Sequence, residues 1–329
     1  MILLNDYLFS GDTVLKILQK YSADLKQSAL DNHNPIDMVH CNFLLQQIDI
    51  LEHNDFLTSQ SQRIRELYKL MAGEYPFLAF TFKGRIKSLI RAEEKFNGYI
   101  VEYVYDYYKK NNEFPSLDNL KQKLNCFRDL IAYRIVISMP QCHIKEGDDR
   151  KEIELDYLYK VANILPEFLE ERGFSVQISE KEGASASKRL DPNLKKYFRD
   201  YIENPSPIGY QSLHITLYDN IARSYIEVQL RTKEMDDYAE IGPANHLGYE
   251  KRQEEERTRR DEIPNGAYPA FDEAYERLAK LHALDLSEVN VNMFGAISNS
   301  VVNDGCGLFR GRLILPYEHL SRFQNDIID

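Results

Sequence analysis

Two runs of alternating residues, 210–217 and 226–231, hold the side chains best suited to chemistry in this sequence. Every second residue of a strand shares a face, so each run predicts a strand with one apolar and one polar side. The polar sets are Tyr210, Ser212 and His214 in the first run and Glu227, Gln229 and Arg231 in the second. A carboxylate, an arginine, an amide and an aromatic ring on one face suit a ligand with phosphates and a flat base. An ordinary solvated face with cross-strand pairs is the alternative.

Basic residues gather in two further places in a chain that is acidic as a whole. Lys87, Arg91 and Lys95 fall at i, i+4 and i+8 of a predicted helix, and Arg85 stands at its start. Positive charge there opposes the helix dipole, which indicates a nearby anion, although a solvated basic face gives the same pattern. The second group lies in residues 188–199, and a basic loop beside a polar sheet face suits a polyphosphate.

Two carboxylates are candidates for a metal site. Asp129 opens a predicted strand, and Glu227 lies in the middle of another. If these strands are neighbours, the pair can hold a divalent ion such as Mg²⁺, which takes one or two carboxylates together with phosphate oxygens. Basic groups, paired acids and an aromatic platform describe phosphoryl or pyrophosphoryl transfer, where catalysis is positioning and charge neutralisation. The sequence has no P-loop and no protein-kinase motif.

The elements that must position these residues follow from periodicity and turn signals. Strands are predicted at 129–138, 174–179 and in the two runs above, and helices at 12–30, 36–52, 56–72, 84–110, 152–172, 188–203 and 270–283. A further helix begins in "TKEMDDYAEIG", and the charge run "EKRQEEERTRRDE" is typical of a solvated helix or linker. This order predicts an α+β fold, a mixed sheet with helices on one face and the polar face left open.

Composition limits the classes of protein to which the chain can belong. It has 329 residues, a formal net charge of −11 and four scattered cysteines without metal-ligand spacing. The charge argues against a general nucleic-acid binder, and the cysteines are typical of reduced thiols in a cytoplasmic protein. The N-terminus lacks the basic region of a signal peptide, and no apolar run reaches the length of a membrane span.

Five motifs in order resemble the synthetase domain of the RelA/SpoT alarmone synthetases, over roughly residues 80–251. They are "GRIKS…K", "FRDLIAYRIV", "DYIENPSPIGYQSLH", "EVQLRT" and "AEIGPANHLGYEK". Each motif is weak alone, but the order, with "GYQSLH" before "EVQLRT", is specific. The resemblance implies a nucleotidyltransferase-like mixed sheet flanked by helices. It also implies an enzyme that transfers the β,γ-pyrophosphate of ATP to the 3′-hydroxyl of GTP or GDP, giving (p)ppGpp.

By position in the motifs, the resemblance also implies roles for single residues. ATP is expected to contact Arg85, Lys87 and Lys95. Mg²⁺ is expected on Asp129 and Glu227, and Glu227 is a candidate to help deprotonate the 3′-hydroxyl. The acceptor nucleotide is expected to meet Tyr210, stacked on the guanine, together with His214, Gln229 and Arg231 near its phosphates and ribose.

The sequence departs from the family pattern in places. Arg91 stands where a serine is frequent and Ser206 where a lysine is common, which puts rate and acceptor choice in doubt. Residues 1–78 lack the His-Asp dipeptide of the family's hydrolase domain, so we expect no alarmone hydrolysis. The chain resembles a small alarmone synthetase, with a helical N-terminal extension (1–78), a synthetase domain (79–260) and a C-terminal extension of a helix and a short strand (261–329).

Two other functions stay open at this point. A toxin-type relative places pyrophosphate on the 3′ end of tRNA, although a tRNA body calls for a broad basic surface that this acidic chain does not indicate. A catalytically silent nucleotide-binding module is the other, and the presence of both candidate metal carboxylates argues against it. Self-assembly of the chain into a homo-oligomer, the preferred acceptor nucleotide and the role of residues 261–329 are left open.

Overall fold

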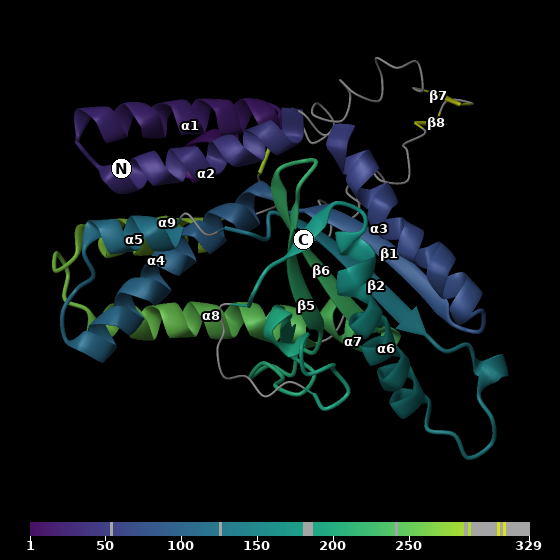
Figure 1. The fold of residues 1–329 in the computed structure, drawn as a ribbon. Helices are drawn as coiled ribbons and strands as arrows, with labels where there is room; N and C mark the ends of the chain where they lie inside the picture. Colours follow the sequence, from purple (N-terminus) through teal and green to yellow (C-terminus); the bar gives the residue numbers. More distant parts are fainter. Residues whose placement is uncertain are drawn as a thin grey trace. The chain divides into compact units, whose positions relative to one another are not determined.

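The computed structural model describes residues 1–52, 55–124, 127–179, 187–240, 243–285, 289–290, 308–309 and 312–313 (Figure 1). The chain divides into two compact units, each described by itself. The helical unit comprises Met1–Asn54, Lys87–Phe127 and Arg252–Asp329, and the sheet unit comprises Asp55–Ile86 and Arg128–Lys251. The domain boundaries expected at 78 and 260 stay a prediction.

The sheet unit is built on a six-stranded sheet in which β2 and β6 are parallel and the other pairs are antiparallel. The order is β1 (Ala79–Ile86), β2 (Ile131–Ser138), β6 (Ser224–Thr232), β5 (Leu213–Asp219) and β3 (Phe174–Val176), and β4 (Phe198–Asp200) also pairs with β5. The prediction of a mixed sheet is confirmed. The strand that follows Asp129 (β2) and the strand that contains Glu227 (β6) are neighbours, as the metal-site hypothesis requires.

The apolar face of this sheet is covered by two helices, α3 (Asp55–Glu74) and α6 (Arg150–Glu170) (Figure 1). It is fully buried at the β5 and β6 positions Leu213, Ile215, Leu217, Ile226, Val228 and Leu230. Burying side chains of this size stabilises the fold by roughly 1.5–3 kcal/mol each. The hydroxyl of Tyr133 on β2 also donates to Gln60 Oε1 of α3, over 2.8 Å.

The register assigns further residues to the opposite, polar face. Arg134 of β2 lies beside Gln229, and His214 lies beside Gln229 from the other side. Lys83 of β1 pairs with Arg134, and Arg199 of β4 pairs with His214. The polar face therefore runs across five strands. A short helix, α7 (Lys233–Glu240), follows β6 directly and lies on this face, so the expectation of helices on one face only is wrong.

Two predicted helices are also wrong in part. The helix expected from Gly84 begins at Leu89, because "AFTFKGRI" alternates with period two and pairs with β2 along its whole length. Ser88 caps the helix, and its side chain accepts from the backbone N–H of Arg91. The basic segment 188–203 forms only a 3₁₀ turn, η3 (Lys195–Tyr197), and strand β4, because pairing with β5 overrides its local helical preference.

The helical unit contains the first two predicted N-terminal helices, whereas the third, α3, belongs to the sheet unit. The helical unit comprises η1 (Leu4–Tyr7), α1 (Val14–Asp31), α2 (Pro35–Glu52), α4 (Leu89–Asn111), α5 (Leu117–Leu124), α9 (Pro269–His282) and the second half of α8 (Pro243–Glu262). The predicted helix 270–283 is α9. It packs against α4 and buries Phe271 and Leu278, and the charge run lies in α8.

The remaining elements are short. A 3₁₀ turn, η2 (Gln141–His143), follows β2, and β7 (Leu308–Phe309) pairs with β8 (Arg312–Leu313). Most of the Gly-rich run expected to hold a short strand lies outside the described residues. Among the described helices, none is both long and apolar enough to cross a membrane.

Candidate functional site

The polar side chains singled out in the sequence meet on the polar face, but that face is buried and not open as expected. His214, Glu227, Gln229 and Arg231 are each at most 7% exposed. Helix α7 and the chain before β5 pack on this face and shield these groups from water. Buried polar groups must be hydrogen-bonded to be tolerated, and these four form one connected network.

Glu227 lies at the centre of this network, on β6. Its Oε1 accepts from Gln229 Nε2 over 2.6 Å, and its Oε2 contacts the Arg199 guanidinium and lies 3.3 Å from His214 Nδ1. Burial alone would raise the pKa of Glu227, but His214 and Arg199 outweigh it and hold that pKa well below its ordinary range. The side chain therefore stays ionised at neutral pH.

His214 connects Glu227 to Tyr210. Its Nε2 lies 2.8 Å from the Tyr210 hydroxyl, and burial lowers the pKa of the imidazole although Glu227 opposes the shift. A neutral ring with its proton on Nδ1 satisfies both contacts, because Nδ1–H then donates to Glu227 and Nε2 accepts from the tyrosine O–H. Tyr201 stands edge-on to His214, with ring centroids 5.0 Å apart.

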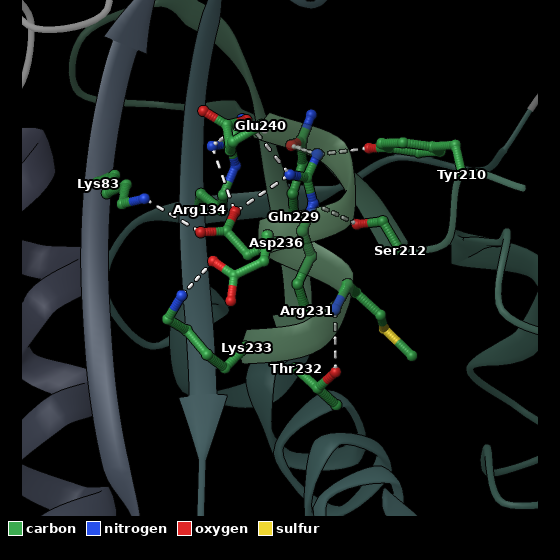
Figure 2. Close-up of polar contacts among 12 residues, drawn as sticks. Lys83, Arg134, Tyr210, Ser212, Gln229, Arg231, Thr232, Lys233, Asp236 and Glu240 are labelled. Carbon is green, nitrogen blue, oxygen red and sulfur yellow. Dashed lines mark hydrogen bonds and ion pairs between the residues drawn. The ribbon is translucent and has the colours of Figure 1, made fainter. Parts of the chain in front are cut away.

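Arg231 completes the connection on the other side of Tyr210. Its Nη2 donates to the Tyr210 hydroxyl over 2.6 Å and to Gln229 Oε1 over 2.9 Å, and its guanidinium lies over the Tyr210 ring at 5.0 Å. Its Nε also donates to Ser212 Oγ over 3.4 Å. Tyr210 and Ser212 precede β5 and are not part of it, yet these bonds hold both residues to the sheet (Figure 2).

Basic residues at the β1 side of the face are matched by carboxylates of α7 (Figure 2). Arg134 lies 2.8 Å from Glu240 and 3.4 Å from Asp236, and Lys83 lies 3.0 Å from Asp236. Burial and the neighbouring Arg231 lower the pKa of the Arg134 guanidinium, and Arg85 adds to the effect. The structure thus brings Arg85 together with Arg134 on the polar face.

The other predicted nucleotide contacts are placed as follows. Lys87, just before α4, and Lys95, on α4, belong to the helical unit, and Lys95 Nζ lies over the Tyr99 ring at 5.2 Å. Asp129 precedes β2 in the sheet unit and acts electrostatically on Arg199, as Glu227 does. Burial lowers the pKa of Arg199, but Glu227, Tyr201 and Asp129 outweigh it and raise that pKa. The Arg199 guanidinium therefore interacts electrostatically with both predicted metal carboxylates.

Sequence reasoning missed part of the site. It assigned no role to Lys83, Arg134, Asp236 or Glu240, and it placed Arg199 in the basic group 188–199 but not beside Glu227. Arg134 did carry a signal, since a single arginine interrupts the otherwise apolar run "IAYRIVIS". Lys83 and Asp236 carried none, because one was assigned to no element and the other to a helix of unknown placement.

Comparison with known proteins finds matches to a part of the middle of the chain. A family model described as a region found in RelA / SpoT proteins matches residues 176–254. A GTP pyrophosphokinase from Photobacterium angustum is 37% identical over 91 residues, and one from Haemophilus influenzae is 38% identical over 91 residues. In both cases the match covers 28% of this chain and 11% of the relative, so it concerns a small part of each of these longer proteins.

Solved structures of two small alarmone synthetases from Bacillus subtilis are also similar. The first, bound to its product pppGpp, is 15% identical with a TM-score of 0.32, over 72% of this chain and 93% of that one. The second is 19% identical with a TM-score of 0.32, over 70% of this chain and 93% of that one.

Proposed function

We propose, on the premise that residues 176–254 are a RelA/SpoT region, that this chain is a GTP/GDP pyrophosphokinase. It transfers the β,γ-pyrophosphate of ATP to the 3′-hydroxyl of GTP or GDP: the 3′-oxygen bonds to the β-phosphorus, the bond from that phosphorus to the α–β bridging oxygen breaks, and AMP and the hydroxyl proton leave. The observation that carries the proposal is the position of Glu227. An ionised, buried carboxylate lies on a sheet face where basic side chains from four strands gather, beside a tyrosine fixed at its hydroxyl. Such a face suits a reaction between two polyphosphates, where charge must be neutralised.

The acceptor nucleotide is assigned to the Tyr210 side of the face. The Tyr210 ring is partly exposed, while Arg231 and His214 hold its hydroxyl from within the protein. A ring fixed at one end loses little freedom when a base stacks on it, which favours stacking of the guanine. His214, Gln229 and Arg231 remain predicted contacts of the ribose and phosphates.

The donor nucleotide is assigned to the β1 side. Arg85 stands on β1 with Lys83, and Arg134 stands on the adjoining strand. Guanidinium groups bind phosphate oxygens in pairs of parallel hydrogen bonds, so this edge suits the ATP phosphates. Lys87 and Lys95 of the helical unit remain predicted ATP contacts.

Mg²⁺ fits the two acidic residues near Arg199. Within the described residues, no three His, Cys, Asp or Glu side chains are grouped to hold a metal. Mg²⁺ does not need such a group, because it is held by one or two carboxylates together with phosphates and water. Asp129 and Glu227 are acids of this kind, since both act on the one guanidinium of Arg199. When bound, the metal neutralises charge on the phosphates.

The residues of the chain have separate parts in the transfer. Glu227 stays ionised because of His214 and Arg199. Its main role is therefore to hold positively charged groups, such as Arg199, near the reacting phosphates. A contribution to removing the 3′-hydroxyl proton requires that Arg199 turn away to a phosphate, because a carboxylate with so low a pKa is a weak base. His214, neutral and held on both sides, positions Tyr210 against Glu227.

Product analysis tests this function directly. The purified chain is incubated with ATP labelled in its terminal phosphates, with Mg²⁺, and separately with GTP, GDP or bulk tRNA. We expect label on a guanosine pentaphosphate or tetraphosphate that anion-exchange chromatography resolves. Label on tRNA alone would support the toxin-type activity, and no transfer to any acceptor would contradict the proposal.

A further inference from the structure

Asp236 of α7 forms ion pairs with basic side chains from three neighbouring strands. Its Oδ2 lies 3.0 Å from Lys83 Nζ on β1, and its Oδ1 lies 3.4 Å from Arg134 Nη1 on β2 and 3.2 Å from Arg231 Nη1 on β6. Figure 2 shows the carboxylate between these side chains, with Glu240 one turn further along the helix. Only 4% of Asp236 is exposed, so the carboxylate is shielded from water.

The electrostatics show why a carboxylate is needed there. Arg134 and Arg231 are both buried and repel each other, which helps to lower the pKa of Arg134. Burial would raise the pKa of Asp236, but Arg134, Lys83 and Arg231 outweigh it and keep that pKa below its ordinary value. Two buried guanidinium groups without this counter-charge would separate or draw in water, because unpaired buried charge is costly.

Arg231 extends the effect of Asp236 to the acceptor side. With Nη1 on Asp236, its Nη2 is aimed at the Tyr210 hydroxyl and Gln229, and its Nε at Ser212. The planar guanidinium fixes these directions relative to one another. Arg231 therefore links Asp236 to the Tyr210 hydroxyl, which His214 holds from the other side.

We propose that Asp236 is a positioning residue for pyrophosphate transfer. It holds one cation from each of β1, β2 and β6 at a fixed spacing, and through Arg231 it fixes the tyrosine on which the acceptor base stacks. Lys83 is its contact on the donor side and Arg231 its contact on the acceptor side. This inference rests on the proposed function of the face, and it adds a residue that touches neither nucleotide.

A double-mutant cycle between Asp236→Asn and Tyr210→Phe tests the connection. The phenylalanine keeps a ring for stacking but loses the hydroxyl that Arg231 holds. GDP affinity is measured by calorimetry in the intact protein. We expect Asp236→Asn to weaken GDP binding about tenfold alone but less than about threefold in the Tyr210→Phe background, because residues in one network couple. Equal losses in both backgrounds indicate a general structural role and would overturn the proposal.

Asp237→Asn is the matched control. Asp237 is the next residue of α7, its side chain is 48% exposed, and its carboxylate contacts Lys233 outside the cluster. The same chemical change there should leave GDP affinity, turnover and the unfolding midpoint unchanged. A loss equal to that of Asp236→Asn would assign the effect to the charge of α7 and contradict the proposal.

A second variant keeps the test decisive if Asp236→Asn does not fold. The Lys83 side chain is 36% exposed, so Lys83→Gln is expected to fold. It removes the donor-side contact and leaves Arg231 on Asp236. The KM for ATP should rise about threefold to tenfold, since one charge-assisted contact near the phosphates is lost, while GDP affinity stays unchanged. An equal loss for both nucleotides would overturn the assignment of sides.

The failures of the two proposals look different. Wild-type protein that transfers pyrophosphate to GDP but shows no coupling between Asp236 and Tyr210 contradicts only the role of Asp236. Wild-type protein that neither transfers nor binds GDP contradicts the proposed function and, with it, this inference.

Discussion

Each unit of the molecule contains a buried glutamate that is paired with a histidine and linked to a tyrosine hydroxyl. In the helical unit Glu93 accepts from Tyr21 over 2.9 Å and lies 2.8 Å from His40 Nε2. In the sheet unit Glu227 lies 3.3 Å from His214, which in turn contacts Tyr210. The residue types are the same, but the surroundings differ.

The surroundings of Glu93 are those of a helix core. His40 stacks on Phe96, with ring centroids 4.2 Å apart, and Asn97 also donates to Glu93. The second carboxylate nearby, Asp37, has its own arginine, Arg277 of α9, at 2.6 Å. Each charge has a partner from another helix, so the network joins α1, α2, α4 and α9 into one core.

Around Glu227, the basic side chains that the structure describes outnumber the carboxylates with which they can pair. Described basic residues on that face outnumber the acidic ones, with Lys83, Arg85, Arg134, Arg199 and Arg231 against Asp129, Glu227, Asp236 and Glu240. A balanced buried pair serves the fold, whereas an excess of one sign beside a partly exposed aromatic ring suits a ligand of the other sign. Excess charge, and not burial, separates the two regions.

Glu227→Gln should give the largest effect on activity. The amide keeps the shape but removes the charge that holds Arg199 and His214, so we expect turnover to fall by about 10²–10³-fold, the usual loss for one electrostatic group. The change also leaves the Arg199 guanidinium without its counter-charge, which lowers stability, so turnover is counted per folded molecule. Glu234→Gln, an exposed carboxylate on α7, is the control. Near-normal turnover in Glu227→Gln would contradict the assignment of Glu227 to transfer and of Glu93 to stability alone.

Glu93→Gln should affect stability and not chemistry. Loss of the charge leaves His40 and Tyr21 with a poorer partner, and breaking a buried ionic contact costs about 3–5 kcal/mol in the free energy of unfolding. Urea unfolding measures it, with the exposed Glu102→Gln on the same helix as control. If Glu93→Gln instead removed transfer while leaving stability intact, the two networks would have the reverse roles from those argued above.

Tyr210→Ala should weaken binding of the acceptor and not of ATP. A stacked base contributes about 1–3 kcal/mol, so GDP affinity should fall roughly 10- to 100-fold. Tyr210→Phe, which keeps the ring, should lose less than Tyr210→Ala. Calorimetric titration with GDP and with a non-hydrolysable ATP analogue compares the two sites, and equal losses for both nucleotides would refute stacking on Tyr210.

The pH dependence of stability should reflect His214 with a smaller effect. Its folded pKa lies below the unfolded value of 6.5, so below pH 6.5 the unfolded chain binds more protons than the folded one. Stability of the sheet unit should therefore fall as the pH drops from 6.5 toward that lower pKa. Hydrogen exchange of β5 and β6 at several pH values measures this, and His214→Gln should reduce the slope. The same slope in wild type and variant would show that His214 does not cause it.

The sequence allowed the polar face to be predicted because alternation is a local property. The pairs Tyr210 with His214 and Glu227 with Gln229 follow from strand spacing, and the motifs named the same residues. The sequence did not show that this face is buried, because the cover comes from α7, whose placement depends on the ion pairs of Asp236 and Glu240 with β1 and β2, which lie far away in the chain.

Other parts of the fold depended on tertiary pairing in the same way. Residues 79–86 have a strand-like alternation but adjoin a strong helical stripe, and only the pairing with β2 decides where the helix begins. Segment 195–200 begins with two helix-forming lysines, yet three of its residues pair with β5 and place Arg199 beside Glu227. Both corrections bring a cation onto the polar face, which local propensity cannot predict.

The most direct test compares the two glutamates in one assay. Wild type, Glu227→Gln and Glu93→Gln are incubated with labelled ATP, Mg²⁺ and GDP, and 3′-pyrophosphorylated product is measured per folded molecule. We predict product from wild type and from folded Glu93→Gln, and a loss of at least about a hundredfold from Glu227→Gln. Product from Glu227→Gln at the wild-type rate, or none from wild type with GDP or GTP, would contradict the assignment of the polar sheet face as the site of transfer.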